Sequence, residues 1–470
     1  MSGVRLQMKL PRSLKFALLS LALLLTTGLG YGVYMLTNLA PIGAAYAAKT
    51  LCSGVFVSGR AALDVIREDI RAENHPLLRF VLPEVDPSRH IASATFLGLA
   101  RREADYRSGL GCTIAFGTIN DPSAAATMAS SSEPDGFEDG SPAGHVDTAK
   151  LQTAIDDAFT EPDSRHLRRT RALVVVQDGR IVAERYAPGF SPTTPLPGWS
   201  MTKTVAGVLI GTLVKAGKLA PEQKGLVAEW RNAGDPRAEI TLDQLLRMTS
   251  GLRFSEDYGD PLEDVAVMLF ARADGAAFAI DKPLEVTPGT RWRYSSGTSN
   301  ILSRVIRIAV GGGEQDYLGY PRHALFNRIG MHSAVIEPDS SGTLVTSSFM
   351  YASARDWARL GQFLLQNGSW NGERIVPDGW VKYMATLTPQ SKRGDFGAHL
   401  WVKVPPPFNG NAAERSRIPS DAFHAVGYEG QFVSVVPSRR LVVVRLGLSR
   451  SERTWNHDAF LARLLEAFPE

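Results

Sequence analysis

The sequence predicts an α/β (more strictly α+β) protein with one antiparallel sheet, helices flanking it, and a helical lobe inserted between its strands. Two observations predict the sheet. Residues 173–183 hold two β-rich runs around Asp178-Gly179, a strong hairpin signal. Residues 432–446 form a second hairpin pattern near the C-terminus, and the chain between them is largely helical in period. Strands at both ends place the terminal segments in one sheet, and the cleft between sheet and lobe is the natural place for a site.

The N-terminus predicts a membrane segment. Residues 16–36 carry no charge and are about the ~20 residues that cross a bilayer. Residues 1–15 carry four basic side chains and would stay in the cytoplasm, with the rest of the chain outside it. A secretory signal cleaved near residue 47 is the alternative, because Ala45-Tyr46-Ala47 has the form of a cleavage site. The length of the apolar stretch favours an uncleaved signal anchor.

Residues 49–118 are predicted to form a small mixed module, in which residues 54–58 are strand-like and residues 61–72 are helical in period. The chain has two cysteines, Cys52 and Cys112, and both lie in this module. In an exported protein such a pair readily forms one disulfide, and two buried free thiols are the alternative. The module either packs on the rest of the protein or holds it at a set height above the membrane.

Residues 119–144 are rich in Ser, Ala, Gly, Pro and Asp, which predicts a linker or mobile loop. Residues 145–470 then form one continuous α/β unit. The formal net charge of +3 is too small to indicate a nucleic-acid partner.

A serine and a lysine carry the most informative pattern. Ser200 follows Pro197-Gly198 and precedes an apolar helical run, so it lies at or near a helix N-terminus. Free N–H groups and the positive dipole end favour a developing oxyanion there. Lys203 lies one turn later on the same face, and a buried lysine has a lowered pKa that lets it take the hydroxyl proton. Taken alone, S-x-x-K also fits an N-capping serine followed by an ordinary surface lysine.

Two later segments add to the pair. Tyr294-x-Ser296 follows a Pro-Gly turn, and a tyrosine on such a loop can share the lysine's proton and pass it to a leaving group. Gly427 and Tyr428 directly precede the terminal hairpin, where an edge strand can offer backbone groups to a substrate carbonyl. The plainer alternatives are a core tyrosine with a satisfied hydroxyl and a simple turn.

In this order, S-x-x-K, Y-x-S and a glycine strand resemble the serine β-lactamase and penicillin-binding-protein superfamily. The likeness is greatest to the class C-like branch with esterases and 6-aminohexanoate-dimer hydrolases. It covers roughly residues 145–470. It implies Ser200 as the acylated nucleophile and Lys203 with Tyr294 as the proton-transferring pair. It also implies the N–H groups of Ser200 and Tyr428 as oxyanion donors. Three further segments support the resemblance: residues 245–252, 354–361 and 427–431.

The glycine strand departs from the pattern of β-lactamases and peptidases. Those proteins usually carry Lys-Thr-Gly or His-Thr-Gly there, whereas this chain has Ala425-Val426-Gly427. His424 comes one position earlier and in a strand would point to the opposite face. An ester or amide therefore fits better than a β-lactam carboxylate. Ser296 also stands where class C β-lactamases have Asn, as it does in the nylon-oligomer branch.

These patterns together predict a membrane-anchored, outward-facing serine hydrolase for a small ester or amide. A DD-peptidase or β-lactamase is one alternative, and a non-catalytic cell-envelope binding protein of the same fold is another. The sequence around Ser200 lacks the G-x-S-x-G nucleophile elbow of a Ser-His-Asp hydrolase. No H-E-x-x-H, C-x-x-C or EF-hand loop occurs, so no metal or other cofactor is expected.

Overall fold

The computed structural model describes residues 11–117, 146–164, 166–450 and 454–469. The predicted linker, residues 119–144, lies outside the described residues, as does most of the predicted cytoplasmic segment.

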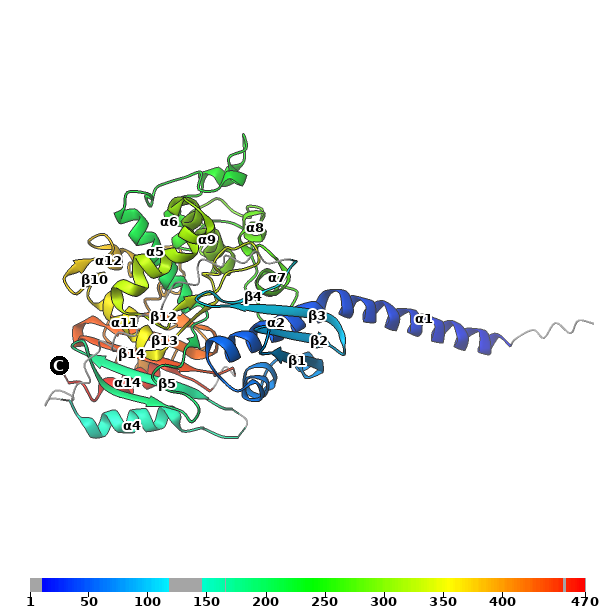
Figure 1. The fold of residues 1–470 in the computed structure, drawn as a ribbon, viewed down its shortest axis with the longest axis horizontal. Helices are drawn as coiled ribbons and strands as arrows, with labels where there is room; N and C mark the ends of the chain where they lie inside the picture. Colours follow the sequence, from blue (N-terminus) through cyan, green and yellow to red (C-terminus); the bar gives the residue numbers. More distant parts are fainter. Residues whose placement is uncertain (1–10, 118–145, 165, 451–453, 470) are drawn as a thin grey trace, which may run out of the picture.

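The centre of the molecule is a five-stranded antiparallel sheet in the order β12-β13-β14-β5-β6 (Figure 1). Its strands are β5 (Thr170–Gln177), β6 (Arg180–Tyr186), β12 (Phe423–Gly427), β13 (Gln431–Val436) and β14 (Leu441–Gly447). The two predicted hairpins meet where β14 pairs with β5, with Val443 opposite Val175. The turn between β5 and β6 is Asp178-Gly179, and both residues have positive φ. The predicted fold class is confirmed.

Helices bury both faces of this sheet. On one face α11 (Ala354–Leu365) packs on β5, β13 and β14, and on the other α4 (Thr148–Phe159) and α14 (His457–Leu465) pack together. Successive side chains of a strand point to opposite faces. Val174 therefore belongs to the larger hydrophobic cluster and Val175 to the smaller one beneath α14. Burial on both faces explains why β5, β13 and β14 are largely continuous apolar runs.

The inserted lobe lies between β6 and β12. Its helices are α5 (Met201–Lys215), α6 (Leu242–Leu246), α7 (Asp264–Ala271), α8 (Gly275–Ile280), α9 (Ser296–Val310) and α10 (Glu314–Pro321). A three-stranded sheet joins the lobe to the body: β7 (Leu196–Pro197), β9 (Met350–Ala352) and β8 (Val335–Ile336). Smaller elements complete it: β10 (Ser369–Trp370), β11 (Glu373–Arg374), α12 (Trp380–Met384) and α13 (Ala412–Arg415). The short helical turns are η6 (Ala228–Trp230), η7 (Pro236–Glu239), η8 (Arg322–Phe326), η9 (Asn327–Ile329), η10 (Tyr428–Gly430) and η11 (Pro437–Arg439).

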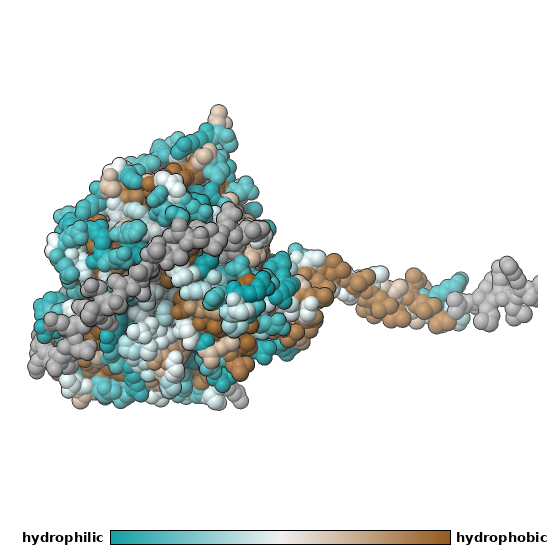
Figure 2. All heavy atoms as spheres, viewed as in Figure 1, coloured by the Kyte–Doolittle hydropathy of each residue, from teal (hydrophilic) through white to brown (hydrophobic). Residues whose placement is uncertain are grey.

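One helical run of 46 residues, Arg12–Val57, forms the N-terminus. Its parts are α1 (Arg12–Tyr34), η1 (Met35–Leu39), α2 (Ala40–Cys52) and η2 (Ser53–Val57). In α1 no residue is buried, and this helix projects from the body with a largely hydrophobic surface (Figures 1 and 2). By length and composition the run is apolar enough to cross a membrane. By contrast, α2 lies in the protein interior, with Ala44 and Ala47 fully buried.

The strand predicted for residues 54–58 is wrong, because Ser53–Val57 is a π-helical continuation of α2. Gly54 lies so close to Val65 that a side chain at this position would collide with it. Packing of this helix therefore overrides the β-propensity of the valines and phenylalanine in the segment. The helical prediction for residues 61–72 is confirmed by α3 (Ala62–Asp64) and η3 (Val65–Arg71).

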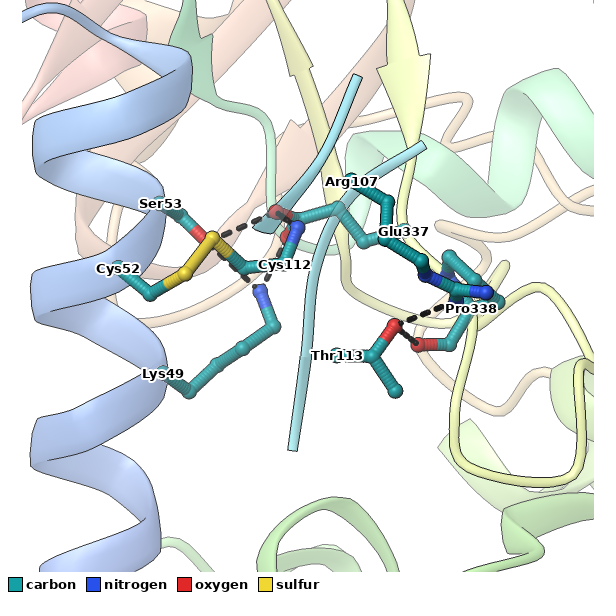
Figure 3. Close-up of a disulfide and its surroundings, with 8 residues drawn as sticks. All are labelled: Lys49, Cys52, Ser53, Arg107, Cys112, Thr113, Glu337 and Pro338. Carbon is teal, nitrogen blue, oxygen red and sulfur yellow. Dashed lines mark hydrogen bonds and ion pairs between the residues drawn. A yellow bond between two sulfur atoms is a disulfide. The ribbon is translucent and has the colours of Figure 1, made fainter. Parts of the chain in front are cut away.

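A four-stranded antiparallel meander packs on α2. Its strands are β1 (Val81–Asp86), β2 (Ile91–Phe96), β3 (Leu99–Arg107) and β4 (Gly111–Ile114), and the turn η4 (Pro76–Phe80) precedes them. The predicted disulfide between Cys52 and Cys112 is present and joins the end of α2 to β4 (Figure 3). Residues 40–117 are called the N-terminal module below.

Candidate active site

The turn before α5 places Ser200 at the start of the helix. The N–H of Gly198 donates to the carbonyl of Met350 at 2.8 Å, which fixes the turn to the small sheet. A side chain at Gly198 would collide with the buried ring of Trp357, so this close approach requires glycine. Trp199 has a positive φ of 47°, and Ser200 follows as the N-cap residue of α5. Its side chain makes no capping hydrogen bond to the helix. The hydroxyl is therefore not used as an ordinary cap.

Lys203 lies one turn along α5 with its ammonium group directed at the serine. Its Nζ donates to Ser200 Oγ at 3.0 Å, to Ser296 Oγ at 3.0 Å and to the carbonyl of Ser347 at 2.8 Å. The residue is 2% exposed. Burial lowers the pKa of Lys203 to about 8, because an interior of low dielectric disfavours the charged form. A far larger neutral fraction is thus available near neutral pH than for an exposed lysine.

Tyr294 and Ser296 close the other side of this cluster, just before and at the start of α9. Lys203 Nζ lies 4.9 Å from the ring centroid of Tyr294. The ring stacks on Trp401 at 5.5 Å, which holds it in place. Burial raises the pKa of Tyr294 well above its ordinary value, and a hydrogen bond with Ser200 opposes this only in part. The phenol is therefore neutral and can donate a hydrogen bond. The structure brings together all four residues of the predicted set in the lobe: Ser200, Lys203, Tyr294 and Ser296.

A glutamate that the sequence analysis missed completes the cluster. Glu256 accepts hydrogen bonds from the Ser296 N–H at 2.7 Å and from Ser296 Oγ at 2.5 Å. Tyr258 donates to the same carboxylate at 2.8 Å. Ser296 connects this carboxylate to Lys203 by hydrogen bonds. The attraction of the negative charge raises the pKa of Lys203, and the larger effect of burial lowers it. No sequence motif marks Glu256, which lies in an irregular loop.

The end of β12 lies beside the turn that carries Ser200. At Gly427 a side chain would collide with the carbonyl of Gly198, so this strand end and the turn are in close contact. Tyr428 follows, and the edge of its ring packs on Trp199 at 5.8 Å. Gly427 at the end of β12 and Tyr428 at the start of η10 therefore both lie beside the turn that carries Ser200. Their role as oxyanion-binding residues stays a prediction.

His424 has other partners, in agreement with the expected alternation of β12. Its Nδ1 lies 2.9 Å from Ser434 Oγ, which is 2.7 Å from His457 Nε2 of α14. Burial lowers the pKa of His424 to about 3, so the ring is neutral. Ala425 faces the larger cluster beneath α11 and carries no charge. No cation on this part of β12 is available for a substrate carboxylate.

The N-terminal module touches the same region. Trp199 Nε1 donates to Glu429 at 3.0 Å, and Glu429 forms a buried ion pair with Arg450 at 2.7 Å. Arg450 in turn donates to backbone carbonyls of η3, including that of Glu68 at 3.2 Å. One chain of hydrogen bonds therefore links Trp199, the residue before Ser200, to the module. Within the described ranges, no group of three or more His, Cys, Asp or Glu side chains could hold a metal ion.

An antiparallel sheet covered on both faces, with a serine and a buried lysine at the start of a lobe helix, is the arrangement of the β-lactamase-fold serine hydrolases. The chain belongs to this family: the Beta-lactamase family model matches residues 155–465. The N-terminal module lies outside that match.

Individual relatives are more distant. The 6-aminohexanoate-dimer hydrolase of Paenarthrobacter ureafaciens is 26% identical over 222 residues, which are 45% of this chain and 56% of that protein. The chain thus spans little more than half the length of the curated relatives it matches. A provisionally assigned 6-aminohexanoate-dimer hydrolase from Bacillus anthracis has a similar structure, with a TM-score of 0.54 and 22% identity over 68% of this chain and 83% of that one. A penicillin-binding-protein homologue from Caulobacter crescentus gives a TM-score of 0.53 and 18% identity over 70% of this chain and 98% of that one. At these identities the structural likeness shows the fold alone.

Proposed function

We propose that the protein is a membrane-anchored serine hydrolase that cleaves a small ester or amide through an acyl-enzyme on Ser200. The observation that carries the proposal is the 3.0 Å contact between Lys203 Nζ and Ser200 Oγ in a site where burial brings the pKa of the lysine to about 8. A serine hydroxyl is a weak nucleophile until a nearby base takes its proton. Lys203 in its neutral form is the base that lies within reach.

In the first step Ser200 Oγ attacks the substrate carbonyl carbon and its proton passes to Lys203 Nζ. The developing oxyanion lies at the N-terminus of α5, where the helix dipole and free N–H groups favour negative charge. We assign the N–H of Ser200 and the N–H of Tyr428 as its donors.

In the second step the bond between the carbonyl carbon and the leaving group breaks. Tyr294 gives its hydroxyl proton to the departing oxygen or nitrogen and regains one from the ammonium of Lys203. The raised pKa of Tyr294 supports this role, because a neutral phenol donates a proton whereas a phenolate would have to gain one first. Water then attacks the ester of Ser200, and the same groups return the hydroxyl to its starting state.

The substrate is proposed to be an ester or amide without a carboxylate beside the scissile bond. Ala425 supports this, since it lies where a β-lactamase-like site would need a cation. The DD-peptidase or β-lactamase alternative remains an outcome of the test below and is not favoured by an observation of its own.

The helix α1 is proposed to anchor the protein, with the body outside the cytoplasm. The buried position of Ala45 and Ala47 supports an uncleaved anchor, because cleavage there would remove half of α2 from the core. The disulfide supports an oxidising compartment.

The test uses a fluorophosphonate probe on the full-length protein in digitonin, with p-nitrophenyl esters, short amides, D-amino-acid peptides and nitrocefin as substrates. Labelling and turnover are expected for the wild type and are lost in Ser200→Ala. Absence of labelling in folded wild-type protein would favour the non-catalytic binding protein. Stable acylation by nitrocefin would favour the β-lactamase or peptidase reading.

A further inference from the structure

A cavity of about 150 Å³ lies between the N-terminal module and the body. Its walls are largely apolar: Leu39, Ile42 and Leu78 come from the module and the helix leading into it, and Leu269, Phe270 and Trp199 come from the body. An apolar cavity of about this volume accommodates a ligand the size of benzene. It therefore suits an apolar group of about six carbons.

Aromatic residues at one end of this cavity lie next to the catalytic cluster. Trp199, the residue before the nucleophile, lines the cavity and packs on Tyr428. Tyr428 stacks on Tyr258 at 5.1 Å, and both tyrosines also line the cavity. Tyr258 also donates a hydrogen bond to Glu256 of the catalytic cluster. A substrate with its carbonyl at Ser200 would therefore have the cavity beside it, past the indole of Trp199.

The other end of the cavity lies next to the membrane segment. Leu39 is part of the same continuous helix as α1, three residues after the end of the predicted span. Phe96 also lines the cavity, and the next residues along β2 and β3 are exposed apolar side chains, with Leu97 at 62% and Leu99 at 55%. Leu82 on the neighbouring strand is 50% exposed. Clustered exposed apolar side chains mark an interaction surface. With α1 in a bilayer, this end of the module faces its surface.

We propose that the cavity holds the apolar acyl chain of an amphiphilic ester or amide, while Ser200 attacks the carbonyl at the head of that chain. The inference rests on the proposed hydrolase function and adds the substrate class to it. The N-terminal module is then part of the substrate site.

The first test is a chain-length series. Full-length protein in digitonin, whose rigid steroid is too broad for this cavity, is assayed with p-nitrophenyl acetate, butyrate, hexanoate and octanoate below their micellar concentrations. Each buried methylene contributes about 0.8 kcal/mol, or about fourfold. We expect kcat/KM to rise at least ~10-fold from acetate to hexanoate, well under the ~250-fold of full burial of four methylenes. A flat or falling series with measurable turnover overturns the acyl-chain proposal and leaves the hydrolase intact.

Two cavity-filling variants test the location. Ala266→Leu adds bulk from α7, and Gly43→Leu adds it from α2, where a Cβ would lie 3.7 Å from Leu78 without a clash. Either variant is expected to lower the hexanoate-to-acetate ratio of kcat/KM about tenfold. Ala271→Leu is the matched control, since it makes the same change on α7 away from the cavity and should leave the ratio unchanged. A wild-type ratio in both filling variants, with both folded, overturns the proposal.

A binding measurement separates this inference from the catalytic one. Octanoate is titrated calorimetrically into Ser200→Ala and into Ser200→Ala/Ala266→Leu. Heat of binding in the first and its loss in the second support the cavity even if no ester is turned over, in which case only the proposed catalysis fails. Equal binding, or none in either protein, overturns the assignment of the cavity.

Discussion

Two buried lysines, one in the N-terminal module and one in the lobe, have similar neighbours and different surroundings. Lys49 on α2 donates to Ser53 Oγ, one turn away, at 2.9 Å and to the carboxylate of Glu337 (Figure 3). Lys203 on α5 donates to Ser200 Oγ, also one turn away, and its carboxylate neighbour is Glu256. Each cluster therefore consists of a lysine, a serine on the same helix, and a glutamate from elsewhere in the chain.

The position of the glutamate separates the two clusters. Glu337 binds Lys49 directly and also accepts from Ser53 Oγ at 2.8 Å and from the Cys112 N–H at 2.7 Å. Burial lowers the pKa of Lys49 and the attraction of Glu337 opposes that shift, while the direct pair joins the N-terminal module to the body. Glu256 makes no such direct pair: it binds Ser296, which in turn accepts from Lys203, and burial lowers the pKa of Lys203 to about 8. The same residue types thus form a structural clasp in one place and, in the proposed mechanism, a proton acceptor in the other.

Removing the catalytic lysine has the largest expected effect. Lys203→Met is expected to lower kcat/KM for p-nitrophenyl esters by about 10³-fold or more, because Ser200 then lacks its base. The rate of fluorophosphonate labelling should fall with it. Lys215→Met, at the exposed end of the same helix, is the control and should keep wild-type rates. Activity within tenfold of wild type in Lys203→Met would exclude the lysine as base.

Removing the clasp lysine should act on stability. Lys49→Met leaves Glu337 buried and unpaired, and breaking such a pair costs about 3–5 kcal/mol. We expect a lower Tm in thermal unfolding, with fluorophosphonate labelling of the folded fraction largely retained. The double variant Lys49→Met/Glu337→Gln removes both charges and should recover much of the loss. An unchanged Tm in the single variant would show that the pair does not join the module to the body.

The pH profile distinguishes a neutral Lys203 from a charged one. The base must be deprotonated to act, so kcat/KM should rise about tenfold per pH unit below about 8 and level off above it. The profile is measured with p-nitrophenyl hexanoate at the isosbestic wavelength of the nitrophenol product. A rate independent of pH between 6 and 9, or one still rising at lysine's ordinary ~10.4, would contradict the role.

Local patterns predict much of the body and part of the site. The hairpins and the S-x-x-K turn are short-range features, so the sequence around each of them is informative. The strand predicted for residues 54–58 is wrong because packing of a buried helix determines their conformation. Glu256 could not be predicted because it lies in an irregular loop that only the folded chain brings to Ser296, 40 residues later. The apolar cavity could not be predicted for the same reason, since it exists only where the folded module meets the body.

Replacing Glu256 has the smallest expected effect, and it tests directly how the glutamate of each cluster acts on its lysine. Its charge raises the pKa of Lys203 against the effect of burial, so Glu256→Gln should move the rising limb of the kcat/KM profile to lower pH while the amide still accepts from Ser296. Tyr258→Phe removes one hydrogen bond from the carboxylate and keeps its charge, so its limb should stay at the wild-type pH. If the limb of Glu256→Gln also stays, Glu256 orders Ser296 without acting on Lys203. A limb that moves to higher pH would mean that the carboxylate does not favour the ammonium form, and the contrast with Glu337 would fail.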